Sequence, residues 1–162
     1  MASLPFESAE KLFAAAAEAG VARGELLTAV GVEAGAPLTS QAVCALYEQA
    51  ARLSGDPAFG LHVGEGTSSR MYGLLGYVTA NSRSFGDALS SLAAFQRLWS
   101  DAVVIAVAPS PEGVRLGYRH TERVPADLRR QESEQMMAAN PYENPEKRDW
   151  FVERTRESSP AW

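Results

Sequence analysis

The sequence predicts an α+β fold, in which N-terminal helices precede a long amphipathic helix packed on a small antiparallel sheet that contains a β-hairpin. Apolar side chains recur at helical spacing from Phe85 to Trp99, which predicts the long helix. After Asp101 the pattern changes to β-branched and alternating residues, which is typical of strands. The 162 residues, 46% of them hydrophobic, are enough for one globular domain with a substantial core.

Three helices are predicted in the first third of the chain. Residues 8–19 are rich in alanine and stop at Gly20, and residues 25–30 form a shorter helical segment that stops at Gly31. Residues 39–53 form the clearest amphipathic stretch of the first half, with apolar positions three and four apart. Together these segments predict a helical N-terminal region.

The middle of the chain mixes one ambiguous segment with two helical ones. Residues 59–66 are apolar but contain three glycines, so no helix is predicted there. Residues 73–78 predict a buried helix in which glycines permit the close approach of another backbone. Ser84 with Asp87 three residues later is a capping-box pattern, which places the start of the long helix at this point.

A β-hairpin is predicted next, with strands over residues 103–107 and 114–118 joined by a turn at 109–113. An isolated hairpin is marginally stable, so the sheet must gain further strands or pack on the helices. Helical propensity returns at residues 126–139 and is then lost.

The C-terminal 23 residues have a different composition from the rest. They hold three of the nine prolines and two of the three tryptophans, and they contain no leucine or isoleucine. We therefore expect one folded domain over residues 1–139 and an irregular or disordered tail over residues 140–162.

Charge and cysteine content exclude several classes of protein. Twenty acidic against fifteen basic side chains give a net charge of −5, which argues against a surface built to bind nucleic acid. The single cysteine cannot form an internal disulfide, and the first residues and the apolar stretches lead us to expect neither a signal peptide nor a membrane-spanning segment. We expect a cytoplasmic protein without a membrane partner.

The sequence predicts no catalytic or metal centre. The two histidines, His62 and His120, stand in apolar or strand contexts, and no nucleophile motif accompanies them. The spacings of Cys44 and the histidines match no metal-ligand pair, so a buried thiol and two ordinary histidines are the prediction. We therefore expect neither an enzyme nor a bound cofactor.

Residues 16–30 have the outline of a helix-turn-helix motif, with Ala16 four residues before Gly20. However, residues 1–60 carry seven acidic and three basic side chains, and the second helix, residues 25–30, has no basic side chain that could bind a DNA phosphate. Two packed helices are the preferred interpretation, and direct DNA binding is the alternative.

Aromatic and polar residues gather in the middle of the chain, where a pocket between the long helix and the sheet would suit a small molecule. The residues predicted to bind such a ligand are Tyr72, Tyr77, Phe95, Arg97, Trp99 and Tyr118.

Three motifs in order give the chain a resemblance to a known family. They are Gly-Asp-Pro at 55–57, Gly-Leu-Leu-Gly-Tyr at 73–77 and Phe-Gly-Asp-Ala-Leu at 85–89. Together with the hairpin they resemble the N-terminal effector-sensing domain, called arabinose-binding-like, of AraC-type transcriptional regulators. The resemblance covers about residues 6–139.

This resemblance implies a domain that binds a small effector, forms a homodimer or a heterodimer with related regulators, and controls a C-terminal DNA-binding domain. Here the pattern is lost at Asn140, so DNA binding is not carried over to this chain. A stand-alone module that pairs with full-length regulators is the main alternative. The effector and the oligomeric state stay open at this point.

Overall fold

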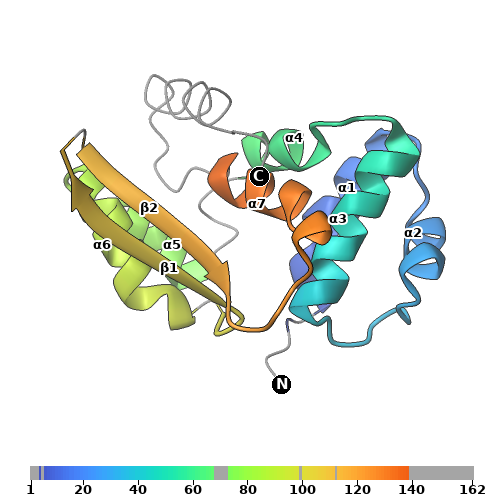
Figure 1. Cartoon of the computed structure of the whole chain (residues 1–162), viewed down its shortest axis with the longest axis horizontal. Helices are drawn as coiled ribbons and strands as arrows, with labels where there is room; N and C mark the ends of the chain where they lie inside the picture. The colour runs from blue at the N-terminus through green and yellow to red at the C-terminus, as the bar shows by residue number, and fades with distance from the viewer. Residues whose placement is uncertain (1–3, 5, 68–72, 99, 112, 139–162) are drawn as a thin grey trace.

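The computed structural model describes residues 4, 6–67, 73–98, 100–111 and 113–138, and the predicted tail over 140–162 lies outside them. The described residues form seven α-helices and one two-stranded antiparallel sheet, which confirms the α+β prediction. In Figure 1, helices α1 to α4 and α7 lie on one side of the molecule, and α5, α6 and the hairpin lie on the other.

The N-terminal helices enclose the main hydrophobic core. Their bounds are η1 Phe6–Ala9, α1 Glu10–Glu18, α2 Arg23–Val30 and α3 Ser40–Ser54. The side chains without any exposed surface in these helices are Leu12, Ala16, Leu26, Cys44, Leu46 and Ala50. Burial of such side chains is the main stabilising term for these helices, since each fully buried leucine contributes about 1.5 to 3 kcal/mol.

Local signals set the ends of α3. The Thr39 hydroxyl accepts a hydrogen bond of 3.1 Å from the Ala42 backbone N–H, which satisfies one free donor of the first turn. Gly55 ends the helix at φ 70°, a left-handed conformation that glycine adopts without a Cβ clash. The predicted helix over residues 39–53 is thereby confirmed.

Helix α4, Phe59–Glu65, was not predicted from its glycine-rich sequence. Helices α4 and α7 pack closely, and a Cβ atom added to Gly60 would lie 1.8 Å from the Gln131 carbonyl oxygen. Gly60 therefore permits contact between two backbones, and this tertiary packing outweighs the low helix propensity of glycine. The expectation that residues 59–66 form no helix is therefore wrong.

The second half of the molecule begins with α5, Gly73–Ala80, and α6, Phe85–Phe95, followed by the short turn η3, Gln96–Leu98. The Ser84 hydroxyl accepts a hydrogen bond of 3.1 Å from the Asp87 N–H, which confirms the predicted cap. The apolar stripe of α6 is less buried than expected at its end, where Phe95 is half exposed. The reason is that the chain continues from α6 as the tighter 3-10 helix η3, which changes the helical period.

Strands β1, Val103–Ser110, and β2, Gly113–His120, form the predicted hairpin, which packs on α6. Pro109 belongs to β1 and pairs with Val114, so the prediction that placed it in the turn was wrong. The backbone N–H and C=O of Ile105 point away from β2 and bind the Gln96 side chain. Pro109 lies an even number of residues further along β1, so its backbone groups also point away from β2. A proline at such a position removes no hydrogen bond between the two strands.

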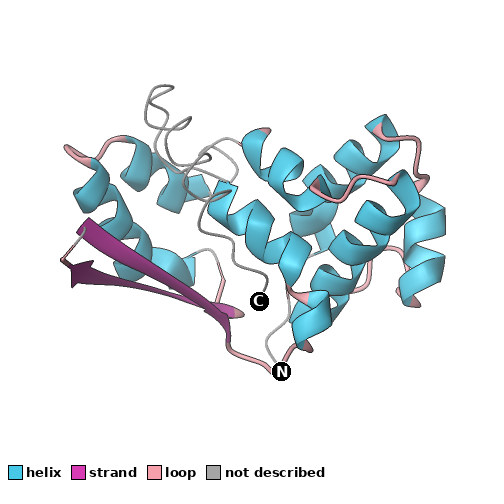
Figure 2. Ribbon diagram, turned by 45° about the horizontal axis from the view of Figure 1, so that its top comes forward, coloured by secondary structure: helices cyan, strands magenta, loops and turns pink. Residues whose placement is uncertain are grey.

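The chain then returns to the N-terminal helices through η4, Ala126–Leu128, and α7, Arg130–Ala138. Helix α7 packs against both α3 and α4 (Figure 2). Within the described part of the chain, none of the helices has the length and apolar character that crossing a membrane requires.

Candidate functional site

Of the six predicted ligand-binding residues the structure describes four, and three of these are exposed. Tyr77 on α5 is 68% exposed, Phe95 at the end of α6 is 49% exposed, and Arg97 in η3 is also exposed. Tyr72 and Trp99 lie outside the described residues. The ligand-binding role of these residues stays a prediction.

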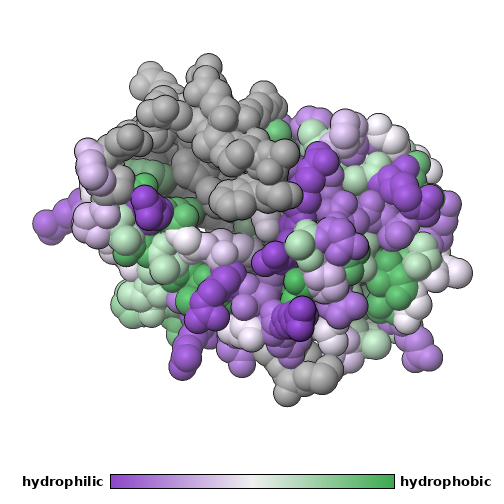
Figure 3. Space-filling model, in the orientation of Figure 1, coloured by the Kyte–Doolittle hydropathy of each residue, from purple (hydrophilic) through white to green (hydrophobic). Residues whose placement is uncertain are grey.

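Large apolar side chains are exposed in this part of the molecule instead. They are 49–68% exposed, we call them the apolar area, and they are Leu74, Tyr77, Phe95 and Leu98. They belong to neighbouring elements, because α5 contacts both α6 and η3. Figure 3 shows hydrophobic side chains on the surface of the half formed by α5, α6 and the hairpin. Exposed apolar areas of this kind mark binding surfaces in many proteins.

Tyr118 belongs to a separate cluster of polar side chains at the junction of the two halves, which we call the junction cluster. It consists of Cys44 from α3, Tyr118 and His120 from β2, and Glu132 from α7. The Cys44 Sγ lies 3.6 Å from the His120 Nε2, and the Glu132 Oε2 lies 3.2 Å from the same nitrogen. The Tyr118 hydroxyl donates a hydrogen bond of 2.5 Å to the other carboxylate oxygen, Oε1.

The junction cluster is buried. Cys44 has no exposed surface, and the side chains of His120 and Glu132 are 5% and 8% exposed. Burial raises the pKa of the Cys44 thiol well above its ordinary value, and the carboxylates of Glu132 and Glu48 raise it further. Among the described residues, the buried Glu132 Oε2 and His120 Nδ1 have no hydrogen-bond partner. The cluster thus holds polar atoms whose bonding capacity is unused.

The geometry of the junction cluster does not suit nucleophilic catalysis. In a catalytic triad the acid and the nucleophile contact opposite nitrogens of the histidine ring. Here Cys44 and Glu132 both contact Nε2, and the thiol has a raised pKa and no exposed surface. The arrangement instead brings a sulfur, a nitrogen and an oxygen atom within 4.8 Å of one another.

Sequence spacing could not have found this cluster. Cys44 and His120 are separated by 76 residues, and they meet because β2 ends beside α3. The alternation of β2 does predict that Tyr118 and His120 share a face, and their rings are 5.4 Å apart in an edge-on contact.

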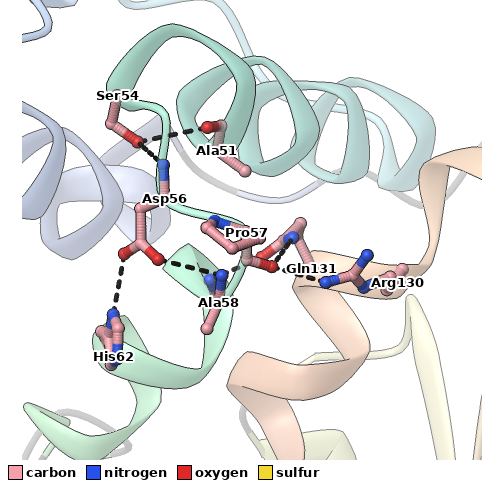
Figure 4. Close-up of polar contacts among 9 residues, drawn as sticks. Ala51, Ser54, Asp56, Pro57, Ala58, His62, Arg130 and Gln131 are labelled. Atoms are coloured by element: carbon pink, nitrogen blue, oxygen red, sulfur yellow. Dashed lines mark hydrogen bonds and ion pairs between the residues drawn. The ribbon is translucent and has the colours of Figure 1, made fainter.

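The other histidine, His62, lies in a second polar group at the start of α4 (Figure 4). Its Nδ1 lies 2.7 Å from the Asp56 Oδ2, and the Asp56 Oδ1 accepts a hydrogen bond from the Ala58 N–H. Desolvation raises the pKa of Asp56, but its hydrogen bonds with His62 and Ala58 outweigh this effect, so the pKa lies below its ordinary value.

The same loop is bound to α7. The Pro57 carbonyl accepts hydrogen bonds from the Arg130 guanidinium and from the Gln131 side-chain amide, as Figure 4 shows. The Gln131 Oε1 in turn accepts a hydrogen bond of 2.8 Å from the Gly60 N–H. The Gly-Asp-Pro motif therefore has a structural function, which is to dock α4 on α7.

Helices α1 and α2 form the two packed helices that were the preferred interpretation of residues 16–30. Arg23 forms an ion pair with Glu10, and its guanidinium lies 4.4 Å from the centre of the Phe13 ring. The one basic side chain of α2 is thus engaged within the protein.

A groove of about 560 Å³ lies where the α2–α3 connection meets the start of α3. Its lining includes the polar side chains of Glu33, Thr39 and Gln41 among apolar residues. None of the predicted ligand-binding residues lines it.

A comparison with family models finds a match over residues 14–140 to the arabinose-binding domain of AraC transcription regulators, N-terminal. Among curated proteins, none has a sequence that matches this chain. The family match covers every helix and strand from α2 to α7.

Proposed function

Because the chain belongs to the family of N-terminal arabinose-binding domains of AraC transcription regulators, we propose that it senses a small effector for such a regulator and has no enzymatic activity. The match over residues 14–140 is the observation that carries the proposal. The junction cluster supports the non-enzymatic part, since its geometry does not suit a nucleophile. We place the sensing unit within residues 1–139.

The proposed effector contacts are Tyr77, Phe95 and Arg97. Two exposed aromatic rings can stack on a sugar or another flat ligand, and a guanidinium can bind a hydroxyl or a carboxylate. Tyr118 is left out of this set because its hydroxyl donates to Glu132.

Thermal unfolding in the presence of candidate effectors tests the proposal. L-Arabinose is the first candidate, followed by small carboxylates, amino acids and fatty acids. A ligand that binds the folded state at 100 times its Kd stabilises the protein by about 2.7 kcal/mol, which raises the Tm by several degrees. A folded sample that no member of these classes stabilises would contradict the sensing function.

Two arginine variants locate the site once an effector is found. Arg97→Gln should weaken binding by about 10-fold or more, because a charge-assisted hydrogen bond contributes about 1.5–3 kcal/mol. Arg83→Gln is the matched control, since Arg83 is also exposed and lies just before α6. Equal affinity in both variants would remove Arg97 from the site.

We further propose that the domain forms a dimer through Leu74 and Leu98 of the apolar area, whereas Tyr77 and Phe95 contact the effector. Exposed leucine side chains are costly to leave in water, and a second copy of the chain would cover them. Pairing with a related full-length regulator through the same area remains the alternative.

A further inference from the structure

We propose that Cys44, His120 and Glu132 form a binding site for a divalent cation of the zinc type, which joins β2 to α3 and α7. This site is independent of the effector site proposed above. It lies at the junction of the two halves, and its three side chains come from three different elements.

Two of the three distances between the ligand atoms agree with a tetrahedral metal. Bonds of about 2.3 Å to sulfur and about 2.0 Å to nitrogen or oxygen, at tetrahedral angles, place sulfur and nitrogen about 3.5 Å apart and nitrogen and oxygen about 3.3 Å apart. The corresponding distances here are 3.6 Å from Cys44 Sγ to His120 Nε2 and 3.2 Å from His120 Nε2 to Glu132 Oε2. The third pair, the Cys44 sulfur and the Glu132 carboxylate oxygen, lies within 4.8 Å, and a bound metal would draw these two atoms to about 3.5 Å.

A network of hydrogen bonds explains this convergence less well. The His120 Nε2 can carry one proton, yet both the Cys44 sulfur and the Glu132 oxygen contact it. Among the described residues, Glu132 Oε2 is buried without a hydrogen bond and has only the 3.2 Å contact with His120 Nε2, although a buried carboxylate oxygen is costly to leave without full hydrogen bonding. One cation can bind the lone pairs of all three atoms at once.

The ligand chemistry selects the metal. A thiolate, an imidazole and a carboxylate are the ligands that zinc uses, whereas magnesium and calcium prefer oxygen alone. The charges of a thiolate and a carboxylate also balance a divalent cation, so the buried site would be neutral. Three protein ligands leave the fourth position for a water molecule.

Tyr118 would orient one ligand. Its hydroxyl donates to Glu132 Oε1, which leaves Oε2 to face the other two ligand atoms. Hydrogen bonds of this kind to a metal-binding carboxylate typically change metal affinity by about 10–100-fold. Tyr118 is therefore a positioning residue in this proposal.

Cobalt(II) is the probe for the first experiment, because a tetrahedral cobalt site with a thiolate ligand has intense visible d–d bands and a near-ultraviolet sulfur-to-metal charge-transfer band. The full chain is freed of metal with a chelator and titrated with Co²⁺ without any effector. We expect both bands to saturate at one Co²⁺ per chain, and Zn²⁺ to abolish them by displacement.

Variants then assign the ligands. Glu132→Gln and Cys44→Ser should each weaken Co²⁺ binding by more than the roughly 10–100-fold that is typical of residues that only hydrogen-bond to a metal ligand. Cys44→Ser should also abolish the charge-transfer band. Tyr118→Phe should keep the band and weaken binding by about 10-fold. The matched control is His62→Gln, which alters the other histidine, 53% exposed beside Asp56, and should bind as the wild type does.

Circular dichroism of each variant separates loss of the site from loss of the fold. If Cys44→Ser does not fold, the wild-type charge-transfer band and the folded Glu132→Gln variant still decide the question. Wild-type protein that binds no Co²⁺, or binds it without a thiolate band, overturns the proposal. So does equal loss of binding in His62→Gln. None of these outcomes depends on whether the domain senses an effector.

Discussion

At the scale of single residues, Gly60 decides how closely α4 can pack on α7. A methyl group at this position would lie 1.8 Å from the Gln131 carbonyl oxygen, which is a backbone atom and cannot rotate away. We expect Gly60→Ala to lower the free energy of unfolding by about 3 kcal/mol, because overpacking outweighs the gain of about 1 kcal/mol in helix propensity.

The matched control is Gly24→Ala in α2, where an added Cβ meets no atom within 4 Å. There the propensity gain acts alone, so this variant should be more stable by up to about 1 kcal/mol. Urea denaturation measures both values. Similar changes in the two variants would contradict the close contact between α4 and α7.

Asp56 should make the stability depend on acid pH. Its pKa is lower in the folded state than in the unfolded chain, so the unfolded state binds more protons as the pH falls. The stabilisation is therefore complete above the unfolded pKa of about 3.9 and is lost as the pH falls through the lower folded value.

Asp56→Asn tests this charge effect, since asparagine can still accept the hydrogen bond from the Ala58 N–H. We expect the variant to lose less stability than the wild type between about pH 5 and pH 3 in urea denaturation. Parallel curves for the two proteins would show that the ion pair with His62 has no effect on folding.

Residue-level predictions succeeded where the cause is local in sequence. The Ser84 cap was predicted because its partner, Asp87, is three residues away. Gly60 and the junction cluster were not predicted, because their partners lie 71 and 76 residues away and only the folded chain brings them together.

At the scale of elements, Gln96 closes the free edge of β1. Its side-chain amide accepts a hydrogen bond from the Ile105 N–H and donates one to the Ile105 carbonyl, as a neighbouring strand would. We expect Gln96→Ala to cost about 1–3 kcal/mol of stability, since it leaves two partly buried backbone groups unpaired.

Gln49→Ala is the control for this variant, because Gln49 bonds the exposed side chain of Arg52 and should cost less than about 1 kcal/mol. Thermal unfolding compares them, and hydrogen exchange at the Ile105 amide gives a local readout. An unchanged exchange rate in Gln96→Ala would contradict the closure of this edge.

Element types followed from periodicity where the pattern was long. The apolar stripe of α6 and the alternation of β2 each repeat over several residues, and both elements were predicted. The seven residues of α4 contain two glycines, and no pattern of that length separates a helix from a loop. Its helical state depends on α7, which is distant in the sequence.

At the scale of the whole molecule, the docking of α7 on α3 and α4 could not be predicted. The sequence indicates that α7 is a helix, but its apolar face is weak, and much of its attachment is polar. The Gln131 N–H donates to Glu48 Oε1, and Gln131 is 2% exposed. Glutamine is usually exposed, so a single sequence does not predict that Gln131 is buried or that it contacts Glu48.

Substitution of the two exposed leucines tests the proposed dimer. Burial of one leucine side chain is worth about 1.5–3 kcal/mol, so replacing Leu74 and Leu98 by glutamate in both protomers should weaken the dimer by at least about 100-fold. The added charges would also repel across a symmetric interface. In sedimentation equilibrium we expect a dimer for the wild type and a monomer for the double variant.

A matched control adds the same charge elsewhere. Thr28→Glu with Ala29→Glu places two carboxylates on the exposed face of α2, far along the chain from the apolar area, and should leave the dimer intact. A wild type that stays monomeric at every concentration would contradict dimerisation, and dissociation of both double variants would assign the effect to net charge. Dissociation of the Leu74/Leu98 variant alone would place the dimer interface on α5 and η3.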